Sequence, residues 1–142
     1  MGKLLIALLL VLGCEATALA CSCVPPSPPE QSRQAAREIV QGAVAIVVVQ
    51  ALRDFEFASG RGERVRVLRT RWGRAPKQFE IQRRASASSA SCDLLLSKGQ
   101  RKTLILYPAG VGRYRIQNLC SDYLVGTPGH LAVTLQEARR RR

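Results

Sequence analysis

The chain has 142 residues, a formal net charge of +12 at pH 7 and a single histidine. This length suits one modest domain, and seven aromatic side chains among Phe, Tyr and Trp are too few to favour the base stacking that single-stranded nucleic-acid binding requires. The positive charge predicts association with anionic polymers. The sequence offers no combination of a nucleophile and a base suited to catalysis, so we do not expect an enzyme.

The first twenty residues have the pattern of a signal peptide. Lys3 supplies the positive charge, residues 4–12 form an unbroken apolar run, and Ala18-Leu19-Ala20 fits the A-x-A cleavage signal. The run is too short to span a bilayer. This pattern predicts a signal peptide over 1–20 and one secreted or periplasmic domain over 21–142, with Cys21 as its first residue. Residues 11–14 also resemble a lipoprotein cleavage box, which would instead place lipid on Cys14.

Four cysteines remain after such a cleavage. An even number in an exported chain favours two disulfides. A bond between Cys21 and Cys23 would close a very small, strained ring, so each is expected to reach a distant partner. The alternative, in which Cys-x-Cys is half of a metal site, is disfavoured because His130 is the single histidine. The four residues are Cys21, Cys23, Cys92 and Cys120.

The first helix is expected shortly after the Cys-x-Cys motif. Ser27 and Glu30 have the spacing of a capping box, and Pro28 suits the first helical position. The helix should extend to about Val40, and Gly42 should end it.

Five strands are expected in the middle of the chain. The first is a nearly continuous β-branched run and should be buried on much of both faces, whereas the second alternates valine with arginine. A turn at Gly60 and Gly62 should precede the second strand, and Pro108 should end the fourth. The expected strands cover residues 43–51, 63–72, 78–82, 103–107 and 113–117.

A second helix is expected to open at Thr127-Pro128, with Leu131, Leu135 and Ala138 facing inward. The basic residues are spread along the chain, which favours solvated strand faces and a basic tail over a dedicated binding site. They comprise Arg64, Arg66, Arg69, Arg71 and Arg74 in one segment, Arg83 and Arg84 in another, and Arg139, Arg140, Arg141 and Arg142 at the end.

These elements predict a mainly β fold. Five closely spaced strands with two flanking helices fit a five-stranded Greek-key barrel of the oligonucleotide/oligosaccharide-binding (OB) type. The strand pattern alone does not separate such a barrel from a sandwich.

The cysteine layout resembles that of a known family. Cys21-Ser22-Cys23-Val24-Pro25-Pro26, followed by Cys92 after a serine-rich loop and Cys120 after the last strand, resembles the inhibitory domain of the tissue inhibitors of metalloproteinases, which has a netrin-like fold. The resemblance covers most of residues 21–124. It implies disulfides from Cys21 to Cys92 and from Cys23 to Cys120. The chain lacks that family's third disulfide and second subdomain, and is more similar to its short bacterial relatives.

The resemblance implies a secreted, monomeric metalloendopeptidase inhibitor without a cofactor of its own. The α-amine and carbonyl oxygen of Cys21 would chelate the catalytic zinc of the target protease, whose open coordination position normally holds water. Ser22 would point into the pocket for the substrate residue after the scissile bond. The alternative is an exported adaptor domain that binds a protein partner or an anionic polymer and does not inhibit. Further protease contacts implied by the resemblance are Cys23, Val24, Pro25, Ala90 and Ser91.

Overall fold

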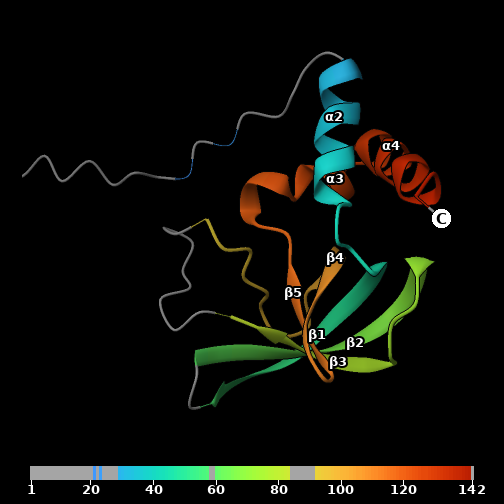
Figure 1. Cartoon of the computed structure of the whole chain (residues 1–142). Coiled ribbons are helices and arrows are strands. Elements are labelled where there is room, and N and C mark those ends of the chain that lie inside the picture. The colour runs from blue at the N-terminus through green and yellow to red at the C-terminus, as the bar shows by residue number, and fades with distance from the viewer. Residues whose placement is uncertain (1–20, 22, 24–28, 58–59, 84–91, 142) are drawn as a thin grey trace, which may run out of the picture.

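A computed structural model describes residues 21, 23, 29–57, 60–83 and 92–141. These residues form a closed five-stranded β-barrel with helices gathered near one end of it (Figure 1). The mainly β class and the barrel are therefore confirmed. The predicted signal peptide and its cleavage site lie outside the described residues.

The barrel closes through five strand pairs. Around it the order is β1-β2-β3-β5-β4, and β4 pairs back onto β1. Every pair is antiparallel except β3 with β5, which is parallel. The strands are β1 (Ala45–Phe57), β2 (Gly60–Gly73), β3 (Gln78–Gln82), β4 (Arg101–Gly110) and β5 (Arg113–Ile116).

The alternation of side chains along β1 explains why its β-branched run is buried on both faces. Val47 and Val49 point into the barrel and pack in its interior with residues such as Leu104. Ile46 points outward, yet it is fully buried because the helices cover that part of the outer surface. Burial on both sides of β1 was predicted from the sequence and is confirmed.

The helices form a second layer over the outside of the barrel. Helix α4 packs its Ala138, Leu131 and Leu135 against this layer's core, as predicted, and Val40, which follows α2, also belongs to it. A short helix between β5 and α4 was not expected. The elements are α2 (Pro29–Ile39), the 3₁₀ turn η2 (Leu119–Ser121), α3 (Tyr123–Gly126) and α4 (Pro128–Arg139).

Several expected strand boundaries are wrong, because β1, β2 and β4 are all longer than predicted. Gly60 and Gly62 do not form a turn but belong to β2, where Gly62 pairs with β1 on one side and β3 on the other. Strand β4 does not end before Pro108 but continues to Gly110. Pro108 is exposed and stands beside a register shift in the β4–β5 pair. Irregular positions of this kind accept proline, which cannot donate to the ladder.

We expect Gly73→Ala to be among the most destabilising single changes in the barrel. Gly73 has φ +77°, and an added Cβ would lie 2.7 Å from the Cα of Ala45. The strain of a positive φ in alanine and the close contact of its Cβ with the Ala45 backbone should together lower the free energy of unfolding by roughly 2–5 kcal/mol. Gly99→Ala is the matched control, since Gly99 has φ +82° but open space around it. Urea unfolding should give a clearly smaller loss for the control, and equal losses would contradict this packing argument.

Candidate functional site

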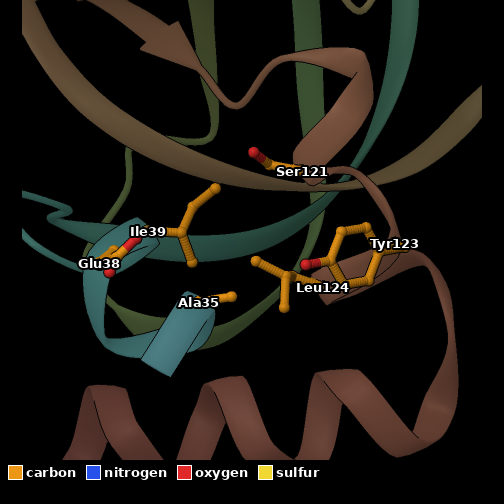
Figure 2. Close-up of a pocket in the computed structure, with 6 residues that line it drawn as sticks. All are labelled: Ala35, Glu38, Ile39, Ser121, Tyr123 and Leu124. Carbon is orange, nitrogen blue, oxygen red and sulfur yellow. The ribbon is translucent and has the colours of Figure 1, made fainter. Parts of the chain in front are cut away.

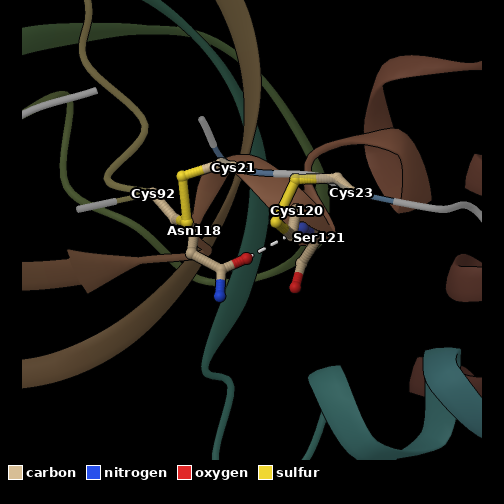
Figure 3. The surroundings of a disulfide bond; sticks show 6 residues. All are labelled: Cys21, Cys23, Cys92, Asn118, Cys120 and Ser121. Carbon is tan, nitrogen blue, oxygen red and sulfur yellow. Dashed lines mark hydrogen bonds between the residues drawn. A yellow bond between two sulfur atoms is a disulfide. The ribbon is translucent and has the colours of Figure 1, made fainter. Parts of the chain in front are cut away.

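Two disulfides hold the Cys-x-Cys segment against the barrel (Figure 3). Cys21 is bonded to Cys92 and Cys23 to Cys120, with Cα–Cα separations of 5.6 Å and 4.8 Å. This is the pairing that the family resemblance implies. Because two residues separated by one position are each tied to a different distant segment, the chain between them is held at both ends.

The two segments that receive these disulfides are themselves joined. The backbone N–H of Leu119 donates to the carbonyl oxygen of Cys92 at 2.8 Å. Cys92 has φ +60°, the one positive value at a described residue other than glycine. Such a conformation is uncommon for a residue with a side chain and persists where neighbouring contacts determine it. Here the disulfide and the hydrogen bond to Leu119 are those contacts.

Two polar side chains, the buried Gln117 and the exposed Asn118, fix the segment that carries Cys120. The Gln117 amide oxygen accepts from the N–H of Ile105 at 2.8 Å, and its nitrogen donates to the Thr103 carbonyl at 3.1 Å. Asn118 then caps η2, its side-chain oxygen accepting from the N–H of Ser121 at 2.8 Å (Figure 3). A capping asparagine before a short turn was the sequence signal that could have identified this support.

A pocket of about 240 Å³ lies between α2 and the η2–α3 segment (Figure 2). Figure 2 shows the Tyr123 ring and Leu124 on one side and Ala35 and Ile39 of α2 on the other. Burial raises the pKa of the Tyr123 hydroxyl. The remaining lining residues are Glu38 and Ser121.

Helix α2, which follows the Cys-x-Cys segment, is fastened to the barrel and to α4. The Tyr107 hydroxyl of β4 donates to the carbonyl oxygen of Ile39. Burial raises the pKa of Tyr107 to about 12, with a smaller opposing effect from the charge of Arg115. Helix α2 is joined to α4 by an ion pair between Arg37 and Glu137, at 3.2 Å.

A buried ion pair involves Arg83, the last described residue before the serine-rich segment. The Arg83 guanidinium donates two hydrogen bonds to the Glu63 carboxylate, at 3.1 and 2.7 Å, and both side chains are less than one-tenth exposed. The N–H of Leu96 also donates to this carboxylate, at 3.1 Å. The expectation that Arg83 belongs to a solvated basic surface is therefore wrong. Its ion pair fixes the chain immediately before residues 84–91, and the Cys92 disulfide fixes it immediately after.

The structure thus brings together four of the site residues expected from the sequence, namely the cysteines. Ser22, Val24, Pro25, Ala90 and Ser91 lie outside the described residues. Leu119, which is 39% exposed next to Cys120, was not expected from the sequence. Its apolar side chain adds to the surface around the two disulfides.

The rest of the described chain shows neither a metal cluster nor a membrane span. Within the described ranges, no three His, Cys, Asp or Glu side chains gather as metal ligands. None of the helices in the same ranges has the length and apolar character needed to cross a bilayer. The disulfides point to an oxidising, extracellular-type compartment. The fold and site define a disulfide-bonded β-barrel domain, for which comparison with protein-family models and with curated proteins found no match.

We expect loss of the Cys23–Cys120 bond to destabilise the domain strongly. The bond joins residues 97 apart, and removing a native disulfide from a small domain costs about 2–5 kcal/mol. Cys23→Ser/Cys120→Ser should therefore lower the urea midpoint, with Cys21→Ser/Cys92→Ser as the matched variant that opens the other loop. Midpoints indistinguishable from the native protein in both variants would show that the bonds do not stabilise the fold.

Proposed function

We propose that the exported domain inhibits zinc metalloendopeptidases by presenting the Cys21 amine and carbonyl oxygen to the catalytic zinc. The observation that carries this proposal is the double attachment of Cys21 and Cys23 to the joined Cys92 and Cys120 segments. A chain terminus is normally mobile. Here the first residue left by the expected cleavage is held by its own side chain, so its backbone atoms can be presented in one orientation.

The chemistry favours such a terminus as a zinc ligand. Catalytic zinc in proteases keeps one position open for water, and a neutral amine together with a carbonyl oxygen can occupy it as a bidentate ligand. Because the disulfides have already restricted the ligand atoms, less conformational entropy is lost on binding than with a flexible peptide. Ser22 would then enter the neighbouring specificity pocket and help to select the protease. The zinc belongs to the target, and the domain itself needs no cofactor.

We further propose that the barrel is of the Greek-key OB type and netrin-like. The strand order β1-β2-β3-β5-β4 with a parallel β3–β5 pair supports this assignment, as do the two disulfides that join the N-terminal segment to the barrel. In this proposal the protein is a monomeric, secreted or periplasmic inhibitor and not an enzyme. Contacts with the protease would come from the Cys-x-Cys segment and from the loop before Cys92.

The test is an inhibition assay with the exported protein whose N-terminus has been verified as Cys21. Titration against a panel of zinc endopeptidases should show stoichiometric inhibition of at least one member, and a small zinc-chelating inhibitor should compete with the protein. Serine endopeptidases provide the control and should be unaffected. Absence of inhibition across the panel would reject the proposal and leave the adaptor function, in which the same barrel binds a partner without zinc chelation.

A further inference from the structure

The outer surface of the barrel is divided into two parts of different character. The helices cover it around Ile46, Ile105 and Trp72, which belong to the apolar layer beneath them. Further along the same strands, away from the helices, the outward positions are mostly arginine. We use the name arginine face for five residues there, Arg53, Arg64, Arg66, Arg101 and Arg113.

Strand pairing brings these arginines together from four strands. One row runs from Arg101 through Gln50 to Arg66, and continues to Gln78. The next row runs through residues 53, 64, 80 and 113, which pair in succession across β1, β2, β3 and β5. Residues directly opposite each other share one face of a sheet. The sequence alone could not reveal this grouping, because its members come from segments far apart in the chain.

The charge on this face is poorly balanced. Glu80 is the single acidic side chain among the described residues of the two rows, and it contacts both Arg64, at 2.6 Å, and Arg113, at 3.7 Å. Arg53 and Arg64 are directly opposite each other, an arrangement of like charges that disfavours folding. Arg53, Arg66 and Arg101 are all exposed. A bound anionic partner would relieve this repulsion.

The spacing of the charges fits an extended polymer better than a small anion. Neighbouring strands lie about 4.8 Å apart, and outward positions along one strand are separated by about 7 Å. Arg101 and Arg66, with Gln50 between them, are therefore about 10 Å apart. A small anion needs donors that converge on one point, whereas this face distributes its guanidinium groups over two rows.

We propose that the arginine face binds a linear anionic polysaccharide. Aromatic side chains are absent from the two rows among the described residues, so the face offers no platform on which nucleic-acid bases could stack. The exposed amide of Gln78 can instead hydrogen-bond to sugar hydroxyls. The Gln50 amide oxygen accepts from Arg66 at 2.8 Å and so holds that guanidinium group on the face. The two disulfides indicate an extracellular-type compartment, where polysaccharides carry regularly spaced sulfate or carboxylate groups. This inference is independent of the proposed protease inhibition.

The experiment compares two variants that lose the same charge. Arg53→Gln/Arg66→Gln/Arg101→Gln changes the arginine face. Arg33→Gln/Arg74→Gln/Arg139→Gln removes three exposed arginines elsewhere, on the two long helices and beyond the opposite end of β2. Each protein is titrated with heparin as the sulfated probe and with polygalacturonate as the carboxylated probe, and a single-stranded DNA oligonucleotide tests nucleic-acid binding.

We expect the arginine-face variant to bind the preferred polysaccharide about tenfold more weakly at low salt, and the control variant to change by less than about threefold. Each contact between a basic side chain and a nucleic acid releases bound counterions, and we expect the same on an anionic polysaccharide. The arginine-face variant makes fewer such contacts, so its slope of log K against log salt should be smaller in magnitude by about two. Both variants should inhibit proteases like the native protein. Equal weakening in both variants, tighter binding of DNA than of either polysaccharide, or no binding by the native protein would overturn the proposal.

Discussion

Extending the exported chain by one alanine before Cys21 is expected to abolish the inhibition of zinc endopeptidases. The extension converts the primary amine of Cys21 into an amide nitrogen, which has no lone pair available for zinc. The new terminus would not be held by the disulfides. The inhibition constant should rise by at least about a hundredfold, which corresponds to a loss of ~2.7 kcal/mol. Steady-state inhibition by native and extended proteins, both with verified N-termini, measures this effect.

The same mechanism predicts how inhibition depends on pH. An α-amino group ordinarily has a pKa of about 7.7 to 8.0, and only its neutral form can bind zinc. Below that pKa the neutral fraction falls about tenfold per pH unit, so the inhibition constant should increase as pH decreases.

Unchanged urea midpoints would show that the alanine extension before Cys21 leaves the fold intact. Equal inhibition by the two proteins would exclude zinc binding by the Cys21 amine.

Replacing Arg83 by methionine is expected to cause the largest loss of stability among the charged positions of the barrel. The substitution leaves the Glu63 carboxylate buried with the Leu96 N–H as its described partner. Breaking a buried ion pair from one side costs about 3–5 kcal/mol, because the remaining charge is neither hydrated nor neutralised. Urea unfolding monitored through Trp72 fluorescence would measure the difference.

Two matched variants separate the effect of the unpaired, buried Glu63 charge from the loss of the Arg83 side chain. Glu63→Gln/Arg83→Met removes both charges but keeps an amide oxygen that can accept from Leu96, so it should be clearly more stable than Arg83→Met alone. Arg113→Met disrupts the half-exposed contact with Glu80 and should cost at most about 1 kcal/mol. If the double variant were as unstable as Arg83→Met, packing of the Arg83 stem and not its charge would be the stabilising contribution.

Periodicity in the sequence was sufficient to find the strands. The predicted third strand at 78–82 has the observed bounds, because alternation of apolar and polar residues there directly reflects burial on one face. The β-branched run at 44–49 was also recognised, but β1 continues to Phe57. Arg53 and Asp54 interrupt the apolar pattern before Phe55 and Phe57, and this distal half pairs with β2. Strand pairing of this kind depends on residues elsewhere in the chain and leaves little local signal.

Buried polar residues were the main features that the sequence did not reveal. Arg83 looked like one more surface arginine, since its partner Glu63 lies 20 residues earlier and contacts it only after β2 and β3 have paired. Gln117 likewise shows no periodic pattern, although its amide joins β4 to the segment that carries Cys120. The cysteines were more informative, because their positions along the chain resemble those of a known family. That resemblance implied the two disulfide pairs that the structure contains.

The two disulfides are interleaved along the chain, and this arrangement limits the order in which they can form. A chain synthesised from its N-terminus exposes Cys21 and Cys23 first, yet their partners follow 71 and 97 residues later. Cys92 precedes β4 and β5, so Cys21 can meet its partner before the barrel is complete, whereas Cys120 follows all five strands. The Cys23–Cys120 bond is therefore the attachment that requires every strand of the barrel to have been synthesised.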